Sequence, residues 1–293
     1  MKTPFISVLM GAYNAQQHIQ QAILSILAQS YEHFELIIIN DGSSDDTLAI
    51  IKNIKDKRII IVDQKNIGLT KSLNKALTIA KGELIARQDA DDISLSTRFE
   101  EQVKAFNQDP DLSLLGSSMY ISNPKGVFNE IFHYPCTDEE LKEAIFHFNP
   151  FIHGAMMIKK LVMISEGGYN ENFQYVQDYE FWSRLVPKYK CQNLSTPFYA
   201  RLREDDCSEN QIDKSGFVEE IQATLKKKHT DFPVDINISI KAQSIYPILG
   251  WPIRHCSQLA KTFANMAIVA ARLSLDTNDY RKKANTYFPW KKY

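Results

Sequence analysis

The run FELIII at residues 34–39 constrains the fold more than any other stretch of this sequence. A short, nearly all-apolar run of this kind is typical of a strand covered on both faces, as in a parallel sheet. Strand-like and helix-like segments alternate around it through the first part of the chain. The predicted strands are residues 5–9, 34–39, 58–62 and 83–86, and the predicted helices are residues 15–29, a segment from about residue 45, and residues 69–80.

This alternation predicts an α/β fold with a doubly wound, mainly parallel sheet. Ligands of such sheets bind outside the carboxyl ends of the strands, where the strand order reverses. Polar side chains follow three of the four predicted strands. Tyr13 and Asn14 follow the first strand, Asp41 follows the second, and an acidic cluster follows the fourth. We therefore expect a ligand site at this edge of the sheet.

Charge divides the 293 residues into two regions. From Lys214 onward there are 13 Lys and Arg against 6 Asp and Glu, whereas residues 1–213 hold 21 against 29. We expect a globular α/β domain over residues 1–213 and a basic, mainly helical extension over residues 214–293. Apolar residues recur at helical spacing between Leu259 and Leu273. This helix either packs on the first domain or lies on an anionic membrane surface, and the sequence leaves both open.

Several function classes are disfavoured by composition. The four cysteines have no regular spacing, so neither a zinc site nor a disulfide framework is indicated. The amino terminus lacks a signal-peptide pattern, and no apolar window is long enough to span a membrane. Basic residues in excess are confined to the extension, so nucleic acid is not an expected partner. We expect a cytoplasmic protein.

The stretch ELIARQDADD at residues 83–92 carries three carboxylates within one turn, Asp89, Asp91 and Asp92. Mutual repulsion would raise their pKa values unless a cation or water intervenes. One interpretation is a helix start, in which Asp91 or Asp92 caps a helix that contains residues 98–106. The other is a divalent metal site, because two hard oxygen ligands lie within reach of one Mg²⁺ or Mn²⁺ that also accepts phosphate oxygens.

The position of the cluster favours the metal interpretation, because a cap needs one acid and because a second acid, Asp41, lies at the same predicted edge. Gly42 and the following serines satisfy the turn after Asp41, so we expect its carboxylate to be free to bind a nucleotide. A Rossmann dinucleotide site is excluded by the first turn, MGAYNAQQH, which has one glycine in place of the GxGxxG pattern.

Residues 5–115 and 149–208 resemble glycosyltransferase family 2, the inverting group with the GT-A fold that builds bacterial surface polysaccharides. Each matching stretch is weak alone, but their order is that of the family. The stretches are SV at 7–8 with YN at 13–14, FELIIINDGS at 34–43, NxG at 66–68 with Asn74, GE at 82–83 leading to DADD at 89–92, RFE at 98–100, NPFIH at 149–153 and QDYEFW at 177–182.

The resemblance implies a role for each matching residue. Asp91 is the expected direct ligand of Mn²⁺ or Mg²⁺, with Asp89 beside it and nearer the ribose, and Asp92 continues the turn. Asp178 is the expected general base; Gln177 replaces the acid that relatives carry before it. His153, Gln177 and Trp182 are expected to shape the acceptor pocket. The residues implied in binding the nucleotide sugar are Tyr13, which would line the base, and Asn14, Asp41, Asn74, Asp89 and Arg203.

The implied reaction moves a sugar from a nucleotide-diphosphate sugar, such as a UDP-sugar, to a hydroxyl of a saccharide or lipid-linked saccharide. A lipid-linked acceptor would suit peripheral contact of the basic extension with the inner face of the cell membrane. Two rival functions remain at this stage. One is a Mg²⁺-dependent phosphohydrolase with an Asp-x-Asp site, although that class needs its nucleophilic Asp after the first strand. The other is a non-catalytic nucleotide-sugar-binding protein.

Overall fold

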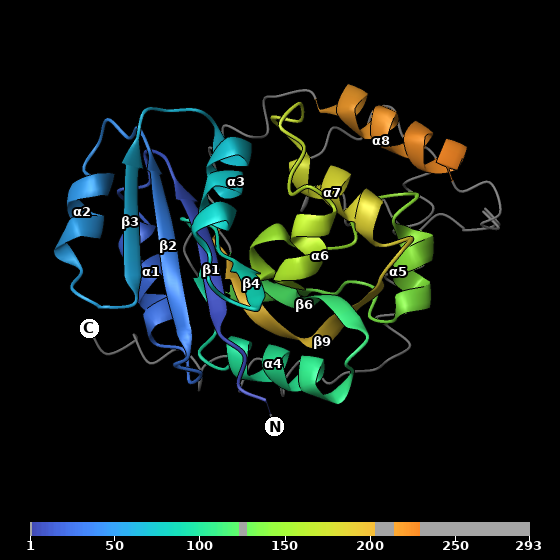
Figure 1. Cartoon of the computed structure of the whole chain (residues 1–293), viewed down its shortest axis with the longest axis horizontal. Helices are drawn as coiled ribbons and strands as arrows, with labels where there is room; N and C mark the ends of the chain where they lie inside the picture. The colour runs from blue at the N-terminus through green and yellow to red at the C-terminus, as the bar shows by residue number, and fades with distance from the viewer. Residues whose placement is uncertain (1, 123–127, 203–213, 229–293) are drawn as a thin grey trace.

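A computed structural model describes residues 2–122, 128–202 and 214–228. The strands run in one mixed sheet with helices on both faces (Figure 1). The strands are β1 (Ile6–Ala12), β2 (Phe34–Asp41), β3 (Ile59–Gln64), β4 (Leu84–Arg87), β5 (Ile93–Ser94), β6 (Leu112–Ser122), β7 (Phe128–Phe132), β8 (Met157–Lys159) and β9 (Lys190–Arg201). The helices are α1 (Ile19–Leu27), α2 (Thr47–Asn53), α3 (Leu69–Ile79), α4 (Arg98–Gln108), α5 (Asp138–Ala144), α6 (Lys160–Ser165), α7 (Gln177–Leu185) and α8 (Ser215–Lys228), with a 3₁₀ turn η1 at His153–Ala155.

The strand order is β3-β2-β1-β4-β8-β6-β9-β5, with β7 paired to β6. The first four strands are parallel, so the predicted doubly wound, mainly parallel half of the sheet is confirmed. Beyond β4 the sheet is mixed, because β8 runs antiparallel to both β4 and β6, whereas β6 and β9 are parallel. The order reverses next to β1, and the carboxyl ends of β1, β2 and β4 therefore meet at one edge.

The sheet separates two apolar cores, which explains why FELIII is apolar except for Glu35, whose buried carboxylate accepts hydrogen bonds from Ser7 and from the Lys81 amide. Ile37 and Ile39 pack into one core with residues of α3 and α7. Leu36 and Ile38 point to the opposite face and pack with residues of α1 and α4. Because alternate side chains of a strand point to opposite faces, a strand between two cores is largely apolar on both faces.

The start of the basic extension is helical, as predicted, and α8 lies along α7 (Figure 1). Val218, Ile221 and Leu225 of α8 are buried in the core that also contains α7. Helix α8 therefore packs on the first domain. The predicted helix around residues 259–273 lies outside the described residues, and the predicted domain boundary at 213/214 falls at the end of another such segment.

Candidate active site

The acidic cluster forms a turn directly after β4. Asp91 is exposed, Asp92 is buried, and the Asp89 side chain is 27% exposed. Neither Asp91 nor Asp92 caps a helix, because α4 begins at Arg98 after Thr97 and the two-residue strand β5 lies between. The helix-cap interpretation of the cluster is therefore wrong.

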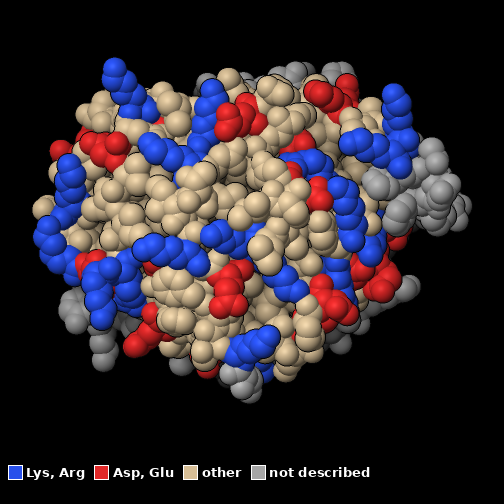
Figure 2. Space-filling model, in the orientation of Figure 1, with Lys and Arg blue, Asp and Glu red and all other residues tan. Residues whose placement is uncertain are grey.

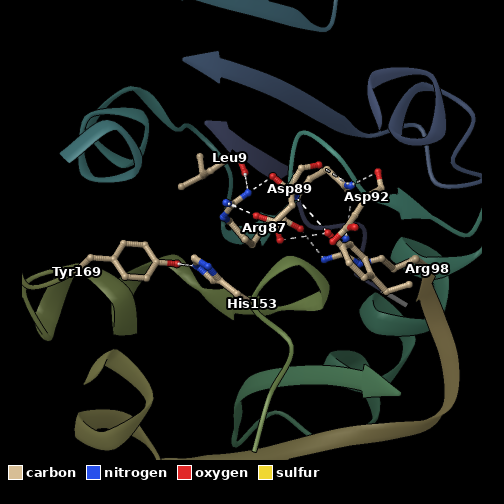
Figure 3. A network of polar contacts seen from close by, with 9 residues as sticks. Leu9, Arg87, Asp89, Asp92, Arg98, His153 and Tyr169 are labelled. Atoms are coloured by element: carbon tan, nitrogen blue, oxygen red, sulfur yellow. Dashed lines mark hydrogen bonds and ion pairs between the residues drawn. The ribbon is translucent and has the colours of Figure 1, made fainter. Parts of the chain in front are cut away.

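Asp89 is anchored by a buried arginine. Arg87, whose side chain is 4% exposed, donates from Nη2 to Asp89 Oδ1 at 2.7 Å (Figure 3). Tyr199 donates to the other carboxylate oxygen at 3.3 Å and accepts a hydrogen bond from the Asp89 amide. Burial opposes ionisation of Asp89, but the positive charges of Arg87 and Arg201 contribute to holding its pKa below the usual value.

Asp92 joins the acidic turn to the end of β9. Its Oδ1 accepts a hydrogen bond from the Leu202 amide at 3.1 Å. Burial, followed by the negative charges of Asp91 and Asp89, raises the pKa of Asp92 well above its usual range. Buried Asp92 therefore connects the acidic turn to the end of β9.

A buried polar network supports the turn from below (Figure 3). Gln88 donates to the carbonyl oxygens of Asp89 and Asp92, which fixes the backbone on both sides of Asp91. The Gln88 side-chain oxygen accepts in turn from Ser94 and from the fully buried Arg98. Because these groups are buried, their hydrogen bonds hold the turn in one conformation.

Asp41 lies at the end of β2 as predicted, but its carboxylate is not free. It accepts hydrogen bonds from Gln64 Nε2 at 2.7 Å, from the Ile67 amide at 3.0 Å and from the Gly68 amide at 2.9 Å. The expectation that the turn after Asp41 leaves this group unbonded is wrong, because it overlooked the loop between β3 and α3. Asp41 braces that loop, and its contact with a nucleotide stays a prediction.

Tyr13 and Asn14 follow β1 at the same edge. The Tyr13 side chain is 55% exposed, as a side chain that lines a nucleotide base would be before the base binds. Asn14 has a positive φ of 49° and accepts hydrogen bonds from Ser44 through its side-chain oxygen. It thereby ties the β1 edge to the loop after β2, and its predicted role in nucleotide binding is untested.

Asn74 has a role that sequence reasoning did not foresee. Its side chain donates to the Tyr169 carbonyl oxygen at 2.9 Å and accepts from the Tyr169 amide at 2.9 Å. A further hydrogen bond reaches Glu171. These bonds clamp α3 to the segment before α7, and they compete with the predicted contact between Asn74 and the nucleotide sugar.

The predicted acceptor-pocket residues lie on η1 and α7. His153 is 9% exposed and its Nε2 lies 2.7 Å from the Tyr169 hydroxyl (Figure 3). Burial, with the charge of Arg87, lowers the pKa of His153 to about 3, so the imidazole is neutral near pH 7. Trp182 is 1% exposed and stacks edge-on against His153 and Phe151. The predicted role of these residues in shaping an acceptor pocket is untested.

Gly154 brings η1 against the acidic turn. A Cβ at this position would lie 1.9 Å from the Tyr199 hydroxyl and 2.6 Å from Asp89 Oδ2. Only a residue without a side chain allows this approach. The close packing sets η1, and with it His153, beside Asp89.

Asp178 is half-buried in the first turn of α7, and Gln177 before it is 8% exposed. Asn149 donates from Nδ2 to Asp178 Oδ2 at 2.7 Å. Burial raises the pKa of Asp178, and the negative charge of Asp89 raises it further. Burial raises the pKa of the Tyr169 phenol, and the negative charges of Asp178 and Asp89 both add to this rise. The segment at residues 149–154 connects Asp178 to the acidic turn, because Asn149 bonds Asp178 and Gly154 packs against Asp89.

Three contributors to the site were not assigned from the sequence. Arg87 could have been found, because an arginine in an otherwise apolar strand needs a carboxylate partner and Asp89 follows two residues later. Arg201 at the end of β9 carries no such local signal, and neither does Tyr199. The predicted phosphate ligand Arg203 lies outside the described residues.

The acidic turn fits a metal that binds together with a diphosphate. Within the described ranges, no group of three or more His, Cys, Asp or Glu side chains is arranged to hold a metal ion alone. Mg²⁺ commonly takes one or two protein carboxylates and completes its shell with water and substrate phosphate oxygens. Asp91, which is exposed, and Asp89, which is partly exposed and bound to Arg87, would supply that donor set.

Charges elsewhere on the surface are mixed. Figure 2 shows Lys, Arg, Asp and Glu side chains interspersed on the visible face, without a large area of one sign. Among the described residues, no helix has the length and apolar character that crossing a bilayer requires.

The fold defined by this sheet is that of the GT-A glycosyltransferases. *Staphylococcus aureus* TarS 1-349 in complex with UDP-GlcNAc superposes with a TM-score of 0.62, covering 78% of this chain and 68% of that one at 19% identity. The *Pyrobaculum calidifontis* mannosyltransferase PcManGT in complex with GDP-Man and Mn²⁺ superposes with a TM-score of 0.55, covering 97% of this chain and 79% of the other at 17% identity. At these identities the similarity concerns the fold alone.

Residues 7–165 match the family described as Glycosyl transferase family 2, and the chain belongs to this family. An O-antigen biosynthesis glycosyltransferase of *Escherichia coli*, WbnJ, is 34% identical over 198 residues, which are 65% of this chain and 76% of WbnJ. An uncharacterized glycosyltransferase of *Haemophilus influenzae* is 36% identical over 195 residues, which are 62% of this chain and 60% of that protein. This second relative is therefore matched over less than two thirds of its length.

Proposed function

We propose that this protein is an inverting glycosyltransferase that moves a sugar from a nucleotide-diphosphate sugar to a hydroxyl of a saccharide or lipid-linked saccharide. The observation that carries the proposal is that one segment, residues 149–154, contacts both carboxylate sites. Gly154 packs against Asp89 of the acidic turn, and Asn149 bonds Asp178 at the start of α7. Family membership favours this function over the phosphohydrolase considered above.

Asp178 would take the proton from the acceptor hydroxyl. A general base works best when its pKa approaches the working pH, and burial raises the pKa of Asp178 toward that range. One carboxylate is enough, in contrast to the pair in an inverting hydrolase, because the leaving group is a nucleoside diphosphate. Neutral His153 and the buried ring of Trp182 would shape the surroundings of the acceptor without exchanging protons near pH 7.

The donor would bind along the edge formed by β1, β2 and β4. Exposed Tyr13 would line the base, and Asp41 and Asn14 would contribute from their ordered loops. Asp91, supported by Asp89, would hold Mn²⁺ or Mg²⁺, which when bound neutralises negative charge on the diphosphate. Arg87, which is paired with Asp89, would fix the orientation of this carboxylate toward the metal and the ribose. Arg203 remains the proposed phosphate ligand from the segment after β9.

The names of similar proteins support the choice of substrates. WbnJ is described as an O-antigen biosynthesis enzyme, and TarS was solved with UDP-GlcNAc. We infer a UDP-sugar donor and a role in cell-surface polysaccharide synthesis in the cytoplasm. A lipid-linked acceptor would bring the protein to the inner face of the membrane, where the basic residues of the extension 214–293 would contact anionic lipid.

A thermal-shift panel of UDP-, GDP- and dTDP-sugars with Mn²⁺, Mg²⁺ or EDTA tests the donor site. We expect one nucleotide class to stabilise the protein in a metal-dependent manner, and Asp91→Ala to abolish that shift. Asp111→Ala, which removes another exposed acid away from the turn, is the matched control and should keep the shift. Equal stabilisation of wild type and Asp91→Ala by the same ligand would rule out the metal assignment.

Catalysis is tested by UDP release from the best donor. We expect metal-dependent release that falls at least about 100-fold in Asp178→Asn, which is the usual contribution of a general base. Glu139→Gln, an exposed acid in α5, makes the same chemical change elsewhere and should leave the rate unchanged. Metal-dependent nucleotide binding without UDP release in wild type would favour the non-catalytic binding protein.

A further inference from the structure

Asn149 connects the loop before η1 to the first turn of α7. Its Nδ2 donates to Asp178 Oδ2 at 2.7 Å, and its Oδ1 accepts from the Phe151 amide at 3.3 Å. The carboxylate needs a donor and the backbone amide needs an acceptor, so these two partners fix which way the Asn149 amide is turned. The short distance is typical of a hydrogen bond to an ionised carboxylate.

The loop that carries Asn149 does not depend on this hydrogen bond for its position. Asn193 of β9 donates to the Pro150 carbonyl oxygen at 3.0 Å. Phe151 is buried and packs edge-on against Trp182, with ring centroids 5.9 Å apart. Because these contacts anchor residues 150 and 151, the loop is held by more than the Asn149 side chain.

Asp178 is held from its own helix as well. Val176 directly before α7 has a φ of 51°, a conformation that is strained for a β-branched residue. Functional sites are where such strain tends to persist, because the surrounding structure maintains it. The backbone amides of Tyr179 and of Asp178 itself stabilise the anionic carboxylate. The described ionisable groups that interact with Asp178 are Asp89 after β4 and the phenols of Tyr134 and Tyr169.

We propose that Asn149 is a positioning residue for Asp178, holding one carboxylate oxygen so that the other is presented to the acceptor hydroxyl. This inference rests on the proposed function, in which Asp178 is the general base. A carboxylate base uses one oxygen at a time, and rotation of the group would remove the reactive lone pair from the acceptor. A donor fixed on Oδ2 prevents that rotation, and it also stabilises the ionised form in a buried setting.

Asn149→Asp separates this role from the loop contact. The substituted carboxylate keeps an acceptor for the Phe151 amide but replaces the donor to Asp178 with a negative charge. We expect kcat for UDP release from the best UDP-sugar to fall at least about 10-fold, with the donor KM unchanged within about twofold. We also expect the acid limb of the kcat profile to move to higher pH by about one unit, because a like charge disfavours ionisation of Asp178.

Three further variants complete the test. Asn149→Ala removes the donor without adding charge, and should lower kcat with a smaller shift of the acid limb. It also carries the test if Asn149→Asp does not fold. Asn107→Asp makes the same charge change at a distant amide that bonds the Lys2 carbonyl oxygen, and should keep wild-type kinetics. Asp178→Asn provides the reference for loss of the base. Thermal unfolding of each variant monitors the fold.

The outcomes distinguish this inference from the proposed function. Wild-type kcat and an unmoved acid limb in Asn149→Asp or folded Asn149→Ala, with Asp178→Asn inactive, would overturn the role of Asn149 and leave the base assignment standing. A wild-type rate in Asp178→Asn would overturn both. A measurement that needs no substrate is the pKa of the ¹³C-labelled Asp178 carboxyl by NMR. We expect it to rise in Asn149→Ala, and an unchanged value would also overturn the inference.

Discussion

Replacing Arg98 with lysine tests the buried network beneath the acidic turn. Arg98 is fully buried at the start of α4, and burial lowers its pKa to about 10, which leaves it charged at neutral pH. Its guanidinium joins α4 to β5, to the end of β4 and to the residue before β8. The five acceptors are Gln102 Oε1 at 3.2 Å, Gln88 Oε1 at 3.4 Å, Ser94 Oγ at 2.8 Å, the Arg87 carbonyl oxygen at 2.9 Å and the Met156 carbonyl oxygen at 3.0 Å.

A lysine ammonium has three donors, so at least two of these acceptors lose their hydrogen bond from residue 98 in Arg98→Lys. Each lost hydrogen bond costs about 1–3 kcal/mol, and the lower figure applies to Gln88 Oε1 and the Met156 carbonyl oxygen, which keep a second donor in Ser94 and in the Arg87 amide. We therefore expect the free energy of unfolding to fall by about 2–6 kcal/mol, measured by urea denaturation with the slope held common to all variants. Conservation of charge does not offset this loss, because the geometry of the planar fork is what matches the acceptors.

Arg58→Lys is the matched control. Arg58 also contacts a carboxylate and a carbonyl oxygen, but its side chain is 21% exposed, so water can replace a lost partner. We expect a loss of about 1 kcal/mol or less for this variant. If Arg98→Lys destabilises the protein no more than Arg58→Lys does, the buried network does not hold the acidic turn in the way described.

Three further predictions concern neighbouring positions. His153 is neutral in the fold, so the stability it contributes is present above its unfolded pKa of about 6.5 and is lost as pH falls toward about 3. His153→Gln should remove up to about 5 kcal/mol of the acid-dependent loss in the free energy of unfolding. If the free energies of unfolding of wild type and variant run parallel with pH, the prediction is wrong. Asp41→Asn leaves at least one of three N–H donors facing an amide NH₂ group. The free energy of unfolding should fall by about 1–3 kcal/mol in the same assay, and an unchanged value would mean that the loop relaxes. Gly154→Ala places a methyl group against Tyr199 and should cost about 1–3 kcal/mol, with a wild-type denaturation midpoint as the contrary result.

The sequence predicted the architecture of the parallel half well. The helix predicted at residues 69–80 is α3, Leu69–Ile79, and FELIII lies in β2. The helix predicted at residues 15–29 is shorter, at Ile19–Leu27, because the turn residues after β1 bond to the loop after β2 instead. The position of the acidic cluster at a strand end was also predictable, since it follows directly from the chain order of apolar run and polar turn.

The mixed half of the sheet was not predictable in this way. Strands β8, β6 and β9 pair across long stretches of sequence, and β8 enters antiparallel between β4 and β6. The site depends on the same long-range packing. The occupied carboxylate of Asp41, the clamp made by Asn74 and the meeting of Asn149 with Asp178 each join residues more than twenty positions apart.

The sequence by itself determined which segments are strands and helices, which strands are buried on both faces, and where carboxylates leave the sheet. Those properties follow from local sterics and from the spacing of apolar residues along a few turns of chain. The tertiary structure alone decided which carboxylates are exposed and which are buried or hydrogen-bonded within the fold, as with exposed Asp91, buried Asp92 and braced Asp41. Burial and hydrogen bonding act through space, and the partners that set them are brought together only when distant elements pack.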